Sequence, residues 1–264
     1  MTKVANMYRA ELHGKLSPKV EYSEDVLTSN VFSFFMYSNR KIFLKEYLEE
    51  LGFRVSSNEA ETAEFIFWPA YDDRTEPDVV LLVGDKYLLF EAKYLSDFGK
   101  ETERLQFQPS REIDGGLLDA KNLGKAEFKF IAITADYCYQ SYKFKYLDKD
   151  QLEKYVIWTN WQQVASCVRR VLETDEKLSL SERLFANDLL TLLEKKKLRR
   201  YEGQRLFSFS GLIDIGGTVF LDSASVKFRG EFAGFTASLE FEKTLAQVDG
   251  PIFFQQQKGG TRGG

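Results

Sequence analysis

Two carboxylates and one amine lie close together in the middle of the chain and could act on a phosphate ester. Asp78 precedes an apolar run, and Glu91 and Lys93 stand at the end of the next one. Carboxylates suit Mg²⁺, which usually takes one or two of them together with water and substrate phosphate oxygens. A lysine beside such an ion can orient or activate a water and stabilise charge that develops on phosphorus. These residue types therefore indicate metal-assisted phosphate chemistry.

The elements that must position these groups are two strands joined by a tight turn. Residues 78–83 and 86–93 are rich in Val, Leu, Phe and Tyr, which favour strands. The intervening Gly84-Asp85 is a two-residue hairpin signal. Both strands are too apolar for an exposed hairpin, so we expect them to lie inside a sheet.

Pairing across this turn would place the two carboxylates opposite one another. If Val83 faces Lys86, Asp78 lies opposite Glu91, with Cβ atoms about 4.5–5.5 Å apart. Because side chains alternate along a strand, Glu91 and Lys93 share one face. Like charges directly opposite one another repel, so this carboxylate pair requires a cation between its members.

The residues that flank these groups complete a known pattern. Pro77-Asp78, followed after a hairpin by Glu91-Ala92-Lys93, resembles the PD-(D/E)XK nuclease superfamily. The resemblance covers residues 21–172 and implies a restriction-endonuclease-like fold, that is, a mixed central sheet flanked by helices. The pattern of the whole chain is most similar to that of a bacterial restriction or defence-type endonuclease.

The resemblance also implies a reaction and its residues. Asp78, Glu91 and the carbonyl of Ala92 would hold Mg²⁺, for which Mn²⁺ is expected to substitute, and Lys93 would position or activate the attacking water. The expected substrate is nucleic acid, above all double-stranded DNA. Because a blunt double-strand cutter normally needs two active sites, a homodimer is a further expectation.

Glu24 has two interpretations. It follows Ser23 at the start of a predicted helix, where an acidic residue is common because it suits the positive end of the helix dipole. Many superfamily members, however, carry a glutamate on the first core helix as an additional metal ligand. Glu24 is the best match for that role in this chain, and Glu21 is the second choice.

Gln108 also has two interpretations. It lies in a helix predicted over residues 102–122 and resembles the glutamine motif that some superfamily branches carry after the lysine. The spacing places Gln108 and Glu112 on one helical face, provided that Pro109 begins the helix. The alternative is an ordinary amphipathic helix with no part in the site.

The remaining elements complete an α/β core. Further elements are predicted in addition to the hairpin and the 102–122 helix. One helix begins at residue 23 and others cover 41–51, 161–172 and 181–198, and the strands cover 64–70, 128–135 and 155–159. Four segments follow from these patterns: an N-terminal arm (1–20), a nuclease core with an added helix (21–200), a β-rich extension (201–254) and a disordered tail (255–264).

Two further segments could contact nucleic acid. Residues 195–200 contain five cations, which could contact DNA phosphates as well as complement a helix C-terminus. Residues 137–148 carry five aromatic side chains interleaved with Lys143 and Lys145, a pattern that can stack bases and bind phosphates. The alternative for the second segment is a packed surface loop.

Composition excludes several classes of protein. The 264 residues, 44% of them hydrophobic, can bury one sizeable core. The single histidine, His13, lies far from the motif, so histidine-based hydrolases and multi-histidine metal sites are excluded. The net charge of −4 is unlike that of a nucleic-acid-binding protein, although binding needs only a local basic face.

Location is predicted from what the sequence lacks. Cys138 and Cys167 do not make a disulfide framework or a zinc site. No apolar run approaches the roughly 18 residues of a membrane-spanning helix, and the first ten residues lack the apolar segment of a signal peptide. We therefore expect a cytoplasmic protein with no membrane partner.

Three alternatives to a DNA nuclease remain open. The same residues would serve a nuclease that acts on RNA or on particular structures such as junctions and flaps. A catalytically silent nucleic-acid-binding module of the same fold is a different class, against which the presence of Asp78, Glu91 and Lys93 together argues. The motif would be coincidental if the folded chain held Asp78 and Glu91 apart.

Overall fold

The computed structural model describes residues 8–71, 75–99, 106–198, 220–222 and 227–229. The chain divides into two units, Met1–Glu202 and Gly203–Gly264. In the second unit, β6 (Phe220–Asp222) and β7 (Lys227–Arg229) pair antiparallel. The rest of the predicted β-rich extension, and the predicted tail, lie outside the described residues.

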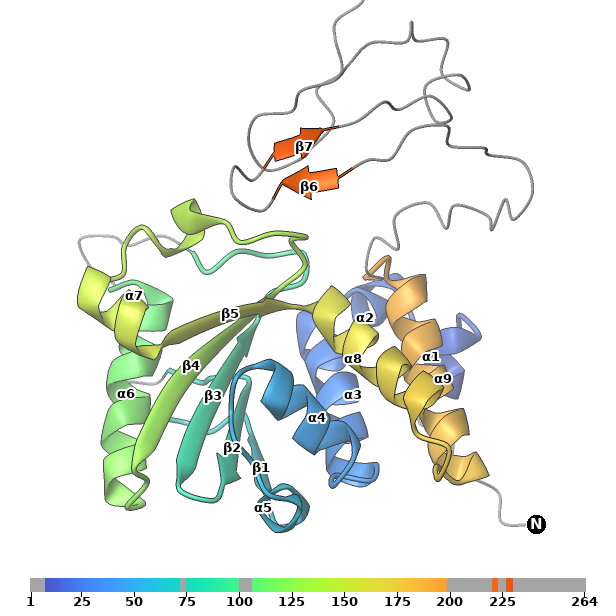
Figure 1. The fold of residues 1–264 in the computed structure, drawn as a ribbon. Helices are drawn as coiled ribbons and strands as arrows, with labels where there is room; N and C mark the ends of the chain where they lie inside the picture. The colour runs from blue at the N-terminus through green and yellow to red at the C-terminus, as the bar shows by residue number, and fades with distance from the viewer. Residues whose placement is uncertain (1–7, 72–74, 100–105, 199–219, 223–226, 230–264) are drawn as a thin grey trace, which may run out of the picture. The chain divides into compact units, whose positions relative to one another are not determined.

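A five-stranded mixed sheet forms the centre of the first unit (Figure 1). Its order along the sheet follows the chain, with β1–β2 and β2–β3 antiparallel and β3–β4 and β4–β5 parallel. The strands are β1 (Glu64–Phe67), β2 (Val79–Val83), β3 (Lys86–Ala92), β4 (Glu127–Thr134) and β5 (Val156–Asn160). This sheet, with helices on both faces, confirms the predicted mixed α/β class.

The β2–β3 hairpin has the predicted register. Val83 pairs with Lys86, and Val79 pairs with Phe90 at the other end of the ladder. The turn residue Gly84 has a φ of 57°, a conformation that favours glycine. The two-residue turn therefore fixes which side chains face one another along the whole hairpin.

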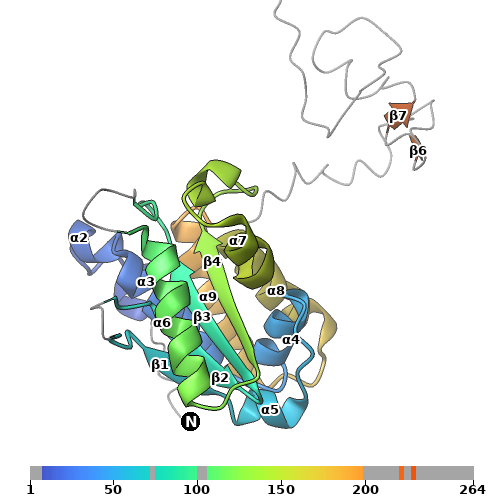
Figure 2. The same cartoon turned by 90° about the vertical axis from the view of Figure 1, so that its left-hand side faces the viewer.

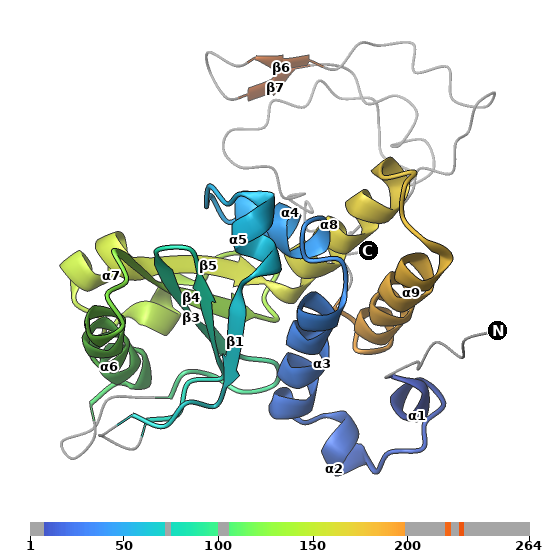
Figure 3. The ribbon, with the colours of Figure 1, turned by 90° about the horizontal axis from the view of Figure 1, so that it is seen from below.

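Helices cover both faces of the sheet (Figures 1, 2 and 3). One face packs against α3 (Glu24–Tyr37), α4 (Phe43–Glu50) and α8 (Trp161–Thr174), and α9 (Leu180–Lys195) lies outside them against α3 and α8. The other face packs against α6 (Gln108–Asn122) and α7 (Lys149–Tyr155). The short helix α5 (Ser57–Glu61) precedes β1. Successive side chains of β3 point to opposite faces of the sheet. The Phe90 ring lies 4.9 Å from the Phe32 ring of α3, whereas Leu89 packs toward α6.

Two glycines let α6 lie close to the sheet. A Cβ atom at Gly116 would lie 2.5 Å from the Phe128 ring, and one at Gly115 would lie 2.5 Å from the Tyr71 ring. Each glycine lowers helix propensity by about 1 kcal/mol, a cost that this close packing explains. The helix begins at Gln108, with Pro109 in its first turn. The predicted start at residue 102 lies outside the described residues.

The N-terminal residues 8–21, predicted as part of an arm, pack on the core instead. They form α1 (Arg9–Leu12) and α2 (Pro18–Glu21). The Tyr8 side chain is fully buried, and its ring stacks on that of Phe185 at 5.8 Å. The Tyr8 ring is therefore one of the groups that hold this segment in place.

The first two lysines of the basic run at the end of α9 bind these N-terminal helices, and contact of the run with DNA phosphates stays a prediction. Lys196 Nζ lies 2.5 Å from Glu11 Oε1, with both residues buried, and Lys195 Nζ lies 2.9 Å from Glu21 Oε1. Lys196 also donates to the carbonyl of Glu21. These lysines are used inside the molecule, and residues 199–200 lie outside the described part.

In the described part of the chain, no helix combines the length and the apolar character that crossing a bilayer requires.

Candidate active site

The candidate site lies at the carboxyl ends of β3 and β4. Because these strands are parallel, their carboxyl ends meet at one edge of the sheet. Glu91 pairs with Ala132 inside the ladder, and Lys93 follows directly after β3. Lys93 N donates to the carbonyl of Ile133 at 2.7 Å, and its own carbonyl accepts from Trp161 Nε1 at 3.1 Å. Both backbone polar groups of the lysine are thus hydrogen-bonded.

Asp78 lies at the open end of the hairpin, directly before β2. Its Oδ2 atom accepts a hydrogen bond of 2.8 Å from the N–H of Ala92, and its carbonyl accepts from Trp68 N at 3.0 Å. Since the N–H and C=O of a strand residue point to the same side, the Ala92 carbonyl also faces Asp78. Continuing the observed register by one residue sets Asp78 opposite Glu91. The two carboxylates thus occupy facing positions of the hairpin, as the prediction requires.

Lys93 contacts two carboxylates. Its Nζ lies 2.6 Å from Glu91 Oε1 and 3.3 Å from Glu24 Oε1. These side chains come from different layers, because Glu91 belongs to the sheet whereas Glu24 is the first residue of α3. Lys93 is only 7% exposed, so the contacts form in a largely dry environment.

Glu24 holds the chain segment that follows β3. Its Oε2 atom accepts hydrogen bonds from Tyr94 N at 2.7 Å and from Ser96 Oγ at 2.6 Å. The structure thus brings Glu24 to the site, and it ties the start of α3 to the chain immediately after Lys93. Its Oε1 atom, 3.3 Å from Lys93, is the oxygen that faces the rest of the site. A role as metal ligand stays a prediction.

Gln108 connects Glu91 to a further buried acid. Its Nε2 donates to Glu91 Oε1 at 2.6 Å and to Glu112 Oε1 at 2.8 Å. An amide NH₂ group has two hydrogens, so it can make both bonds at once. Glu112 is fully buried and was not counted among the predicted site residues. The signal for it was its four-residue spacing from Gln108 on one helical face.

The site contains more acidic side chains than its one lysine can pair with. Burial and the neighbouring Glu91 raise the pKa of Asp78 to about 8. Burial raises the pKa of Glu91, and burial with the charge of Glu91 raises the pKa of Glu112 well above its usual value. Burial alone would lower the pKa of Lys93, but the carboxylates of Glu91 and Glu24 outweigh it and raise that pKa. Lys93 is therefore held as an ammonium.

These residues fit a divalent cation. Glu91 Oε2 is buried and has no hydrogen-bond partner within the described residues. The described part of the chain contains no group of three or more His, Cys, Asp and Glu side chains arranged to hold a metal. Two carboxylates and a backbone carbonyl nevertheless match Mg²⁺, which completes its shell with water and substrate oxygens. Asp78, Glu91 and Ala92 would supply those ligands.

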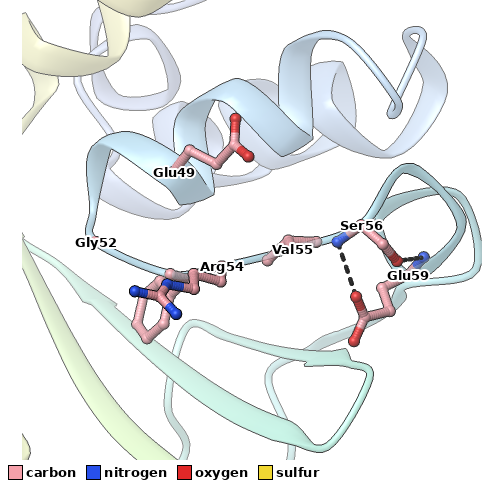
Figure 4. Close-up of a pocket in the computed structure, with 7 residues that line it drawn as sticks. Glu49, Gly52, Arg54, Val55, Ser56 and Glu59 are labelled. Carbon is pink, nitrogen blue, oxygen red and sulfur yellow. Dashed lines mark hydrogen bonds between the residues drawn. The ribbon is translucent and has the colours of Figure 1, made fainter.

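A separate hollow lies near the turn of the hairpin, at the opposite end from this site (Figure 4). Glu59, on its wall, accepts from Ser56 N at 2.8 Å and donates its own N–H to Ser56 Oγ at 3.2 Å. This reciprocal pair caps the start of α5. We assign the hollow a structural role. It is lined by Glu49, Gly52, Phe53, Arg54, Val55, Ser56 and Glu59.

Comparison with known proteins finds no family model, no curated protein and no solved structure that matches this chain.

Proposed function

We propose that this chain is a metal-dependent nuclease of the PD-(D/E)XK type that hydrolyses phosphodiester bonds in DNA. The observation that carries the proposal is the position of the Lys93 ammonium, 2.6 Å from Glu91 Oε1, beside Asp78 at the carboxyl end of β3. A buried cluster of acids around one lysine lowers the stability of the fold. Carboxylates with perturbed pKa values of this kind are typical of functional sites.

The arrangement of strands and helices supports the proposal. An antiparallel hairpin continues into parallel strands, α3 covers one face, and α6 covers the other. This places Glu24 and Gln108 on opposite sides of Glu91 and Lys93. We propose that this is a restriction-endonuclease-like core.

Asp78, Glu91 and the Ala92 carbonyl would hold Mg²⁺ or Mn²⁺. When bound, such an ion supplies Lewis-acid polarisation of the phosphate and lowers the pKa of water. Lys93 stabilises the negative charge that develops on the phosphate and orients the attacking water. Its ammonium keeps its proton, so we assign it no role as a general base.

The accessory residues keep these groups in place. Gln108 fixes the orientation of the Glu91 carboxylate through its 2.6 Å hydrogen bond. Glu24 fixes the chain on the carboxyl side of Lys93 through its bonds to Tyr94 N and Ser96 Oγ. Positioning of this kind matters because small displacements of a catalytic group cost large factors in rate.

The test is a cleavage assay with a matched lysine control. The protein is incubated with supercoiled plasmid, linear duplex, single-stranded DNA and RNA, each with Mg²⁺, Mn²⁺ or EDTA. Lys93→Ala should abolish metal-dependent cutting. Lys86→Ala, at the far end of the same strand, should cut like the wild type.

The outcomes separate the remaining functions. Cutting of RNA alone, lost in Lys93→Ala, would replace DNA by RNA as the substrate. No cutting of any polymer, with no rise in melting temperature in either metal ion, would favour a catalytically silent binding module. Cutting that survives Lys93→Ala would overturn the assignment of the site.

A further inference from the structure

A loop with exposed tyrosines lies at the same edge of the sheet as the candidate site. It follows β4, whose carboxyl end lies beside that of β3, and it includes the 3₁₀ turn Ser141–Phe144 (Figures 1 and 2). Tyr137, Tyr139 and Tyr142 are 63%, 44% and 58% exposed. Exposed aromatic rings grouped in this way mark interaction surfaces more often than single exposed apolar residues do.

A continuous series of aromatic contacts connects this loop to Lys93. The Lys93 ammonium lies 5.6 Å from the centre of the Phe98 ring, and Phe98 lies 5.3 Å from Phe144. Phe144 in turn stacks on Tyr139 at 5.6 Å with an interplanar angle of 6°. Tyr139 also packs against Trp158, with ring centres 6.0 Å apart and an interplanar angle of 75°. Tyr139 is therefore a fixed ring, open on its outer side and three contacts from the ammonium.

Two lysines described at this edge are paired with carboxylates, whereas Lys145 is exposed and its ammonium lies 4.8 Å from the centre of the Tyr146 ring. Lys143 lies 2.8 Å from Asp136 and 3.6 Å from Asp97, and Lys93 is paired with Glu91 and Glu24. Duplex DNA is bound mainly through phosphate contacts by Lys and Arg. Single strands are bound by basic side chains together with stacking of bases on aromatic side chains, and this stacking requires bases that are not already paired.

We propose that Tyr137, Tyr139 and Tyr142 form a stacking surface that selects single-stranded nucleic acid for the candidate site. This inference rests on the proposed nuclease function and narrows its substrate from duplex to unpaired strands. The bases stack on the exposed rings, while the buried rings of Phe144 and Phe98 fix the position of this surface relative to Lys93.

The test measures binding separately from cleavage. Fluorescence anisotropy in EDTA compares a labelled single-stranded DNA, the same sequence as RNA, and its DNA duplex. Wild type should bind the single strands more tightly than the duplex. Tyr137→Ala and Tyr142→Ala should each weaken single-strand binding about 5- to 150-fold, as expected for the loss of one base-stacking contact. The corresponding phenylalanine variants should bind like the wild type.

An exposed tyrosine elsewhere provides the control. Tyr37, 65% exposed at the end of α3, should be replaceable by alanine without effect. Tyr139→Ala is also measured by melting temperature, because Tyr139 packs on Phe144 and Trp158. Unchanged single-strand binding in Tyr137→Ala and Tyr142→Ala would overturn the proposal. So would a wild-type dimer that these variants dissociate, since the tyrosines would then bind protein.

The two proposals can fail independently. Tyrosine-dependent binding of single strands without metal-dependent cutting would keep the stacking surface and reject the nuclease. Cutting that depends on Lys93 but is the same in wild type, Tyr137→Ala and Tyr142→Ala would keep the nuclease and reject the stacking surface.

Discussion

The Oδ2 atom of Asp78 lies 2.8 Å from the backbone nitrogen of Ala92 and accepts its hydrogen bond. This bond favours the ionised carboxylate, and it opposes the burial and the repulsion from Glu91 that favour the neutral acid. The bond also fixes Asp78 on the side of β3 to which the Ala92 carbonyl points. The hairpin thus orients the expected metal ligands through its own backbone.

Replacing Asp78 by asparagine should remove metal binding while keeping the fold. The amide oxygen of Asn can still accept the bond from Ala92, but it brings no charge. We expect Mn²⁺ and Mg²⁺ to raise the melting temperature of the wild type, because a ligand that binds only the folded state stabilises it. Asp78→Asn should lose most of that rise in a thermal-shift measurement.

The control for this prediction is Asp85→Asn, at the turn of the same hairpin, which should keep the full metal-induced rise. Without metal, Asp78→Asn should be at least as stable as the wild type, because it removes the repulsion between two buried acids. A full metal response in Asp78→Asn would show that the ion binds elsewhere.

Replacing Gln108 by alanine should destabilise the protein by about 1–3 kcal/mol, because two buried carboxylate oxygens lose a donor. Those oxygens are Glu91 Oε1 and Glu112 Oε1. Gln108→Glu should cost more, since it adds a third carboxylate beside them. Urea unfolding measures both variants. Gln151→Ala, which removes an exposed amide bond to Asp114, should change the unfolding free energy by less than about 0.5 kcal/mol.

Glu112 should make the metal-free protein less stable as pH rises. Burial raises its pKa above the usual 4.5, so the folded state keeps a proton that the unfolded state releases. The stability that this proton contributes is full below about pH 4.5 and is lost as pH rises through the raised pKa, at about 1.4 kcal/mol per pH unit. Glu112→Gln has no such proton and should lose less stability over the same window.

The measurement is urea unfolding between pH 5 and pH 8 in EDTA. Asp78 and Glu91 have raised pKa values too, so both proteins should lose some stability as pH rises. The prediction therefore concerns the difference between wild type and Glu112→Gln. A difference that stays constant across the pH range would contradict it.

Local rules were sufficient to predict the hairpin and its charged groups. The Gly84-Asp85 turn sets the register, and the alternation of side chains then places Glu91 and Lys93 on one face without any knowledge of the rest of the chain. Glu24 fits both of its interpretations, as an acidic residue at the start of a helix and as a residue that reaches the site. It lies in the first turn of α3, and it also contacts Lys93 across the sheet.

Contacts between side chains that are far apart in the sequence could not be predicted. The lysines at the end of α9 suggested phosphate contact because their sequence shows only their charge. Their carboxylate partners, Glu11 and Glu21, lie far away in a segment without a periodic pattern. Glu112 was missed as a site residue for a related reason. Its spacing from Gln108 was visible, but its complete burial depends on how closely α6 approaches the sheet.

The pair formed by Glu11 and Lys196 should anchor the N-terminal helices. Both residues are buried, at 3% and 5% exposure. Glu11→Gln leaves the Lys196 ammonium buried without its charge partner, which should destabilise the protein by about 3–5 kcal/mol in urea unfolding. The double variant Glu11→Leu with Lys196→Met should recover much of this loss, because it buries no charge.

An exposed ion pair is the control for this last prediction. Lys149 and Glu153 lie 3.7 Å apart with side chains 83% and 68% exposed. Lys149→Met should therefore change the unfolding free energy by less than about 1 kcal/mol. If Lys196→Met were equally harmless but weakened the binding of DNA, the lysine would serve phosphate contact after all. The structure argues for the opposite outcome, because the ammonium lies against Glu11, the carbonyl of Glu21 and the ring of Tyr94.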